Sequence, residues 1–133
     1  VHRWTGRCYA AAVLIGAPSG LVLALNANGG AVTRTGFAML ALAWAAATYM
    51  GVWHARGGRY VIHRQWMIRS YALALGAVTL RLQVPIWVNL FETDYTGVLP
   101  IIAWASWVPN ILLAEWHIRG TRASVIRNEL GTA

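Results

Sequence analysis

The chain has 133 residues, of which 58% are hydrophobic and only 11% are charged. An ordinary soluble domain carries roughly a quarter charged residues, so this composition excludes one and predicts an integral membrane protein. The formal net charge is +7, and every basic residue is an arginine. Because these arginines punctuate long apolar runs and do not cluster on one polar face, we expect a lipid-bilayer partner and no nucleic acid.

Four apolar runs are long enough to cross a bilayer, which takes about 20 residues of α-helix. They predict helices over about residues 7–28, 35–55, 66–91 and 97–117. The connections between them are short, and short connections make neighbouring helices antiparallel. The predicted fold class is therefore all-α, an integral membrane antiparallel bundle of four transmembrane helices. This domain would span residues 1–119, and residues 120–133 would form a short cytoplasmic tail.

The arginines divide unequally between the two ends of such a bundle. The end that holds both termini and the second connection carries nine arginines: Arg3, Arg7, Arg56, Arg59, Arg64, Arg69, Arg119, Arg122 and Arg127. The opposite end carries Arg34, with the acidic Glu92 and Asp94. Cytoplasmic loops of membrane proteins carry the excess of Lys and Arg. We therefore expect a multi-pass protein of the bacterial inner membrane with both termini in the cytoplasm.

Arg81 and Asn110 need partners because they fall inside the predicted spans, where polar groups are costly. Arg81 lies 18 residues after His63 and on the same face of the third helix, about 27 Å further along its axis at ~1.5 Å per residue. We expect Arg81 to pair with Glu92 or Asp94 or to reach lipid phosphates, with a ligand contact as the alternative. Asn110 follows Pro109 in the fourth helix, and its amide requires a partner at that depth.

The histidines gather, by position, at the predicted cytoplasmic boundary, and Glu115 lies at nearly the same depth. His2 and His63 each open a helix in matching contexts, "HRW...R" and "HRQW...R". This match indicates a duplicated helical hairpin, which would place the two imidazoles about the bundle axis. Imidazole and carboxylate groups at one level can bind a transition metal. The candidate metal ligands are therefore His2, His63 and Glu115.

The same two histidines are also candidates for binding haem b. Two imidazoles can ligate a haem iron from its two faces, and arginines beside them can contact the propionates. The candidate cofactor-binding residues are then His2 and His63 with Arg7 and Arg69. The alternative is that both histidines are interfacial anchors that bind nothing.

Three segments of the chain resemble one bacterial family: "HRWTGRCYAAAVLIGAPSGL", "HRQWMIRSYALALGAVTLR" and "PIIAWASWVPNILLAEWHIR". The family is that of predicted membrane proteins catalogued as domain of unknown function 2306, and the resemblance runs from His2 to about Arg119. It implies the membrane architecture and supplies no established activity. Family members often carry a further apolar helix before the first His-Arg, and we expect this chain, which starts at Val1, to lack it. The signature positions are His2, Arg7, His63, Arg69, Arg81, Asn110 and Glu115.

These observations leave several functions open. The first is a small redox protein that binds haem or a metal near the cytoplasmic boundary. The second is a non-enzymatic membrane subunit or helper whose arginines bind lipid phosphates. The third is an oligomeric small-molecule transporter, since four helices enclose little cavity without oligomerising. The sequence shows no HExxH, CxxC, nucleophile elbow or Walker loop, so it assigns no enzymatic activity, and it leaves a homo-oligomer or a membrane-protein partner open.

Overall fold

The computed structural model describes residues 2–91 and 94–131, with side chains for residues 2–90 and 94–123. In this part of the chain every regular element is an α-helix: α1 (His2–Leu25), α2 (Gly30–Arg56), α3 (Tyr60–Phe91), α4 (Tyr95–Ala105) and α5 (Val108–Gly131). Four segments are long and apolar enough to cross a membrane, namely α1, α2, α3 and the α4–α5 unit taken together. The predicted all-α bundle with four spans is confirmed.

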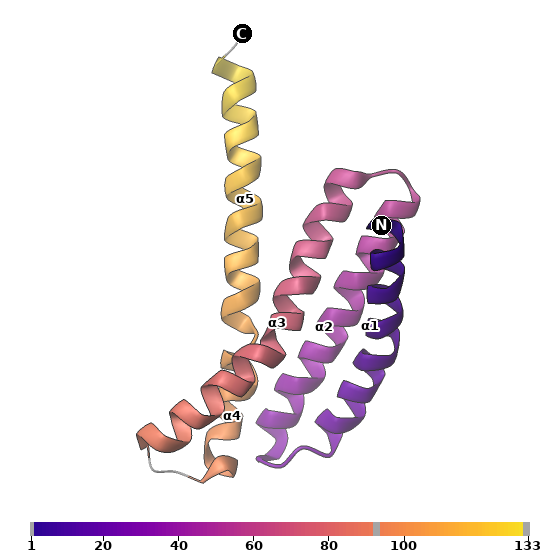
Figure 1. Ribbon diagram of the computed structural model, residues 1–133. Coiled ribbons are helices and arrows are strands. Elements are labelled where there is room, and N and C mark those ends of the chain that lie inside the picture. Colours follow the sequence, from indigo (N-terminus) through magenta and orange to yellow (C-terminus); the bar gives the residue numbers. More distant parts are fainter. Residues whose placement is uncertain (1, 92–93, 132–133) are drawn as a thin grey trace.

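The helices pack as an antiparallel bundle with α2 at its centre. Helix α2 lies between α1 and α3, α4 packs on α2 and α3, and α5 packs along α3. Figure 1 shows the N-terminus, the α2–α3 turn and the C-terminal end of α5 at one end of the molecule. We call this the arginine-rich end, because Arg3, Arg7, Arg56, Arg59, Arg64, Arg119 and Arg122 belong to it. The side chain of Arg127 lies outside the described residues.

Much of the outer surface of the bundle is apolar. On α1 alone, Leu14, Ile15 and Leu23 are 77%, 72% and 71% exposed. A soluble monomer rarely exposes a contiguous apolar surface of this kind. In a bilayer these side chains contact lipid tails, so the surface agrees with the hydropathy of the helices.

Three helices are longer than expected at the arginine-rich end. Helix α1 begins at His2, α3 begins at Tyr60, and α5 continues to Gly131 through the segment expected as a tail. The first residues of α3 are polar and aromatic, so a hydropathy argument places the start of the helix too late. Arg69 therefore lies in the third turn of α3, about 14 Å from its first residue at ~1.5 Å per residue.

The fourth span was predicted as one helix, and the structure divides it into α4 and α5. The break falls at Ser106 and Trp107. Pro109 follows two residues later, and a proline has no N–H to donate to the carbonyl four residues earlier, here that of Ala105. The side chain of Gln83 on α3 replaces the missing donor, with Nε2 3.2 Å from the Ala105 oxygen.

Small residues let the helices approach closely. A Cβ added at Gly16 of α1 would lie 3.3 Å from the ring of Trp44 on α2. A Cβ added at Gly76 of α3 would lie 2.9 Å from the Cβ of Trp107. Trp107 is buried in a core that joins α2, α3 and the start of α5. The packing therefore depends on a tryptophan in contact with a glycine at both places.

A polar network inside the bundle ties α1, α2 and α3 together. The Tyr9 and Ser70 hydroxyl oxygens are 2.7 Å apart, and the Ser70 and Thr48 hydroxyl oxygens are 2.6 Å apart. Trp44 Nε1 donates to the Tyr9 oxygen at 3.1 Å, and Thr48 donates to the Trp44 carbonyl at 2.9 Å. Each hydroxyl thus has a partner, as polar groups in a low-dielectric interior require.

Candidate functional site

The structure brings His2 and His63 together at the arginine-rich end. They open α1 and α3, which start at the same end of the bundle with α2 between them. Their ring centroids are 6.5 Å apart, and the ring planes meet at 73° in an edge-to-face arrangement. His2 is exposed and His63 is half-buried. The proximity expected from the matching motifs is present, while the duplication itself stays a prediction.

The tautomer of His63 follows from its hydrogen bond. Its Nδ1 lies 2.8 Å from the carbonyl oxygen of Gly51 on α2. A carbonyl oxygen only accepts, so Nδ1 carries the hydrogen and Nε2 of the neutral ring keeps its lone pair. Histidines that bind metals are typically oriented in this way, by donation from the other ring nitrogen to a backbone carbonyl or carboxylate.

The other two histidines lie apart from this pair. His54 is 8% exposed and its Nδ1 is 2.8 Å from the carbonyl oxygen of Met50, one turn earlier in α2. His117 lies on the surface of α5. Across the described residues, no three or more His, Cys, Asp and Glu side chains gather as a metal-binding group. Among the described residues, a metal ion at this site would therefore have two protein ligands, His2 and His63.

Glu115 forms an ion pair with Arg69 that joins α5 to α3. Arg69 Nη2 donates to Glu115 Oε2 at 3.2 Å, and Arg69 Nε donates to Oε1. The Arg69 guanidinium also lies over the Trp66 ring, 4.7 Å from its centroid. The two side chains are only 19% and 30% exposed. Glu115 therefore faces its neighbouring helix, and both of its oxygens contact Arg69.

Arg7, the other arginine expected at a cofactor, lies exposed on α1. Its guanidinium is 5.9 Å from the centroid of the Trp4 ring, and it forms no ion pair with a residue that the structure describes. Arg69 is held between Glu115 and Trp66. Of the two arginines, Arg7 is therefore the one without an acidic partner among the described residues.

Arg81 and Asn110 occupy different environments in the second half of α3 and the start of α5. Arg81 is exposed, and its Nη1 donates to the Ala77 carbonyl at 3.3 Å. It forms no pair with Asp94 in the described chain, and Glu92, the other expected partner, lies outside the described residues. Asn110 has its expected partner, because its Nδ2 donates to Thr79 Oγ1 at 3.0 Å.

The break in the fourth span carries polar atoms that sequence reasoning missed. Asn110 Nδ2 also donates to the Ser106 carbonyl at 3.2 Å, and Gln83 Nε2 donates to the Ala105 carbonyl. Gln83 Oε1 and Trp107 Nε1 are buried without a partner among the described residues. The proline in the Trp-Val-Pro-Asn run, residues 107–110, was a sequence signal for this break. No local signal indicated that Gln83 would donate to the freed carbonyl of Ala105.

Four apolar spans, a lipid-facing apolar surface and charge gathered at one end define a multi-pass helical membrane protein. The chain belongs to the family described as "Predicted membrane protein (DUF2306)", which it matches over residues 1–118. The resemblance found in the sequence is thereby confirmed. Comparison with curated proteins and comparison with solved structures gave no match.

Proposed function

We propose that this protein binds a transition-metal ion through His2 and His63 at its arginine-rich end and acts as a small redox protein of the membrane. One observation carries the proposal: two imidazoles from distant parts of the chain lie 6.5 Å apart between centroids. The Gly51 carbonyl accepts from His63 Nδ1 and so leaves Nε2 as the ligand atom. Copper and iron, which imidazole suits, would give the site its redox activity.

A bare metal ion fits this arrangement better than haem b does. A metal ion needs nitrogen atoms at about 2.0–2.1 Å, whereas a haem also needs a slot for its ring and donors for its propionates. The two hollows described on this surface are lined by α3 and α5, away from His2. Arg69, expected at a propionate, is paired with Glu115. Haem b, with Arg7 at a propionate, is the alternative that the experiment distinguishes.

Two imidazoles leave coordination positions for water or for another molecule. Glu115 becomes a third ligand only if it leaves Arg69, which would put an unpaired guanidinium inside the bundle. We therefore assign Glu115 to helix packing and the two histidines to the metal. By the excess of arginine, this end of the protein faces the cytoplasm of a bacterial inner membrane.

The test is metal retention by the purified protein. The protein in mild detergent is equilibrated with Cu²⁺, Zn²⁺ or Co²⁺, desalted, and analysed by mass spectrometry for metal per chain. We expect about one ion per chain, lost in His2→Ala and in His63→Gln and retained in His117→Ala, the matched control at the same end. His63→Gln keeps a donor for the Gly51 carbonyl, so the fold survives. Equal metal retention in all three variants contradicts the proposal. A Soret band that is present in the wild-type spectrum and lost in His63→Gln would show that the two histidines bind haem and not a bare ion.

A further inference from the structure

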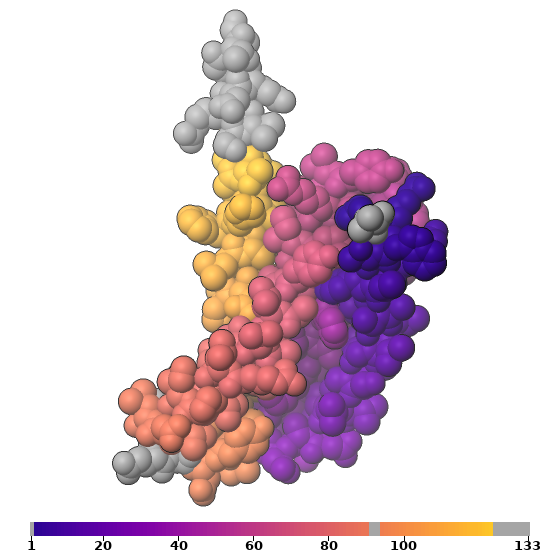
Figure 2. Space-filling model, in the orientation of Figure 1, coloured from indigo at the N-terminus to yellow at the C-terminus, as the bar shows by residue number. Residues whose placement is uncertain are grey.

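A groove runs between the first half of α3 and the middle of α5. Arg64, Gln65 and Val61 line it from α3, and His117, Ile118 and Arg122 line it from α5. Its volume is about 290 Å³. We call it the α3–α5 groove. In Figure 2, α5 flanks α3 on the side away from α1, so the groove between α3 and α5 lies away from α1.

Two arginines bring positive charge to this groove, and neither forms an ion pair with a residue whose side chain the structure describes. Arg64 and Arg122 are both exposed. Arg122 Nη2 donates to Gln65 Oε1, a neutral oxygen, so the bond orients the guanidinium and leaves its charge intact. Glu115 lies two turns before Arg122 on α5, and its pairing with Arg69 keeps it from repelling an anion. The groove therefore favours a negatively charged group.

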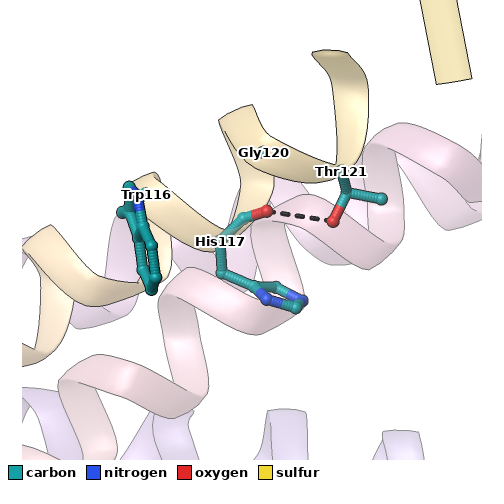
Figure 3. A pocket seen from close by; sticks show the side chains of 4 residues that line it. All are labelled: Trp116, His117, Gly120 and Thr121. Carbon is teal, nitrogen blue, oxygen red and sulfur yellow. Dashed lines mark hydrogen bonds between the residues drawn. The ribbon is translucent and has the colours of Figure 1, made fainter. Parts of the chain in front are cut away.

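Beside its polar residues the groove has an apolar surface, which decides the class of ligand. Val61, Ile68 and Ile118 line it, and Ile118 is only 3% exposed. A soluble anion gains nothing from such a surface, whereas an acyl chain does. A second hollow shares His117 and Thr121 with the groove. Figure 3 shows the residues that line this hollow, among them the exposed Trp116. Exposed tryptophans are typical of the headgroup level of a bilayer.

We propose that the α3–α5 groove binds an anionic phospholipid, with its phosphate at Arg64 and Arg122 and an acyl chain along Val61 and Ile118. Arginine binds phosphate through short charge-assisted hydrogen bonds, and basic pockets between membrane helices bind anionic head groups. The lipid would also fasten α5, which packs along α3 and lies apart from α1 and α2.

The experiment measures lipid binding by native mass spectrometry of the detergent-solubilised full chain. Phosphatidylglycerol and phosphatidylcholine are titrated separately into wild type, the groove variant Arg64→Gln/Arg122→Gln, and the control Arg56→Gln/Arg59→Gln. The control removes the same charge at the same end but outside the groove. We expect wild type to prefer phosphatidylglycerol, the groove variant to bind it about tenfold more weakly, and the control to change by less than about threefold.

A second variant keeps the test decisive if the groove variant fails to fold. Val61→Asp puts a negative charge where the acyl chain would lie, about one turn before Arg64, and an acidic residue in the first turn of α3 is compatible with the helix. It too should lose the preference for phosphatidylglycerol. Three results overturn the proposal: no preference in wild type, equal loss in groove variant and control, or displacement of the lipid by inorganic phosphate at equal concentration. Metal retention is measured separately and does not affect the readout.

Discussion

The ion pair between Arg69 and Glu115 should be a principal connection between α5 and the rest of the bundle. Glu115→Gln keeps the shape of the side chain but leaves the Arg69 guanidinium charged and without its carboxylate. Breaking a fully buried ion pair costs about 3–5 kcal/mol. The Arg69 and Glu115 side chains are still 19% and 30% exposed, so their pair is not fully buried. We therefore expect Glu115→Gln to lower the free energy of unfolding by about 2–3 kcal/mol.

A double-mutant cycle separates the pair from other effects of each substitution. The free energy of unfolding is measured in mixed micelles for wild type, Glu115→Gln, Arg69→Gln and the double variant. The Trp66 ring, which stacks on Arg69, contributes fluorescence that reports the transition. We expect a coupling of about 1–2 kcal/mol, since contacting residues couple by about 0.5–3 kcal/mol. Additivity of the two single changes within about 0.5 kcal/mol would refute the reasoning.

Two further predictions concern packing and orientation. Gly76→Ala puts a Cβ 2.9 Å from the Cβ of Trp107 and should lower the stability by about 1–3 kcal/mol. The control is Gly6→Ala, where a Cβ meets open space. It should leave the thermal unfolding temperature unchanged or slightly raised. In a cysteine-free background, Gly57→Cys in the α2–α3 turn should resist an impermeant thiol reagent added to intact cells, and Asn28→Cys in the opposite turn should react. Labelling of Gly57→Cys alone would invert the orientation.

The four spans and the shared end of the termini were predictable because each follows from one-dimensional quantities. Hydrocarbon thickness fixes how many apolar residues a span needs, and the arginine distribution groups the termini with the second connection. The proximity of His2 and His63 was also predictable, since matching motifs open two helices that start at the same end. These inferences need no knowledge of side-chain packing.

The partner of Glu115 and the break in the fourth span were not predictable in the same way. The polar first turns of α3 hid the true start of the helix, and no sequence signal paired Arg69 with Glu115. Pro109 was visible in the sequence, but a helix continues through a proline when neighbouring groups satisfy the freed carbonyl. Here Gln83 satisfies that carbonyl and the helix still breaks, an outcome that depends on how α3 packs against α4.

The most direct test of the account is the coordination of a metal bound to the purified protein, measured by X-ray absorption on the copper- or zinc-loaded form. The account predicts two imidazole nitrogens at about 2.0–2.1 Å from the metal, reduced to one or none in His63→Gln and in His2→Ala. A metal without imidazole ligands, or a spectrum that neither substitution changes, would contradict it.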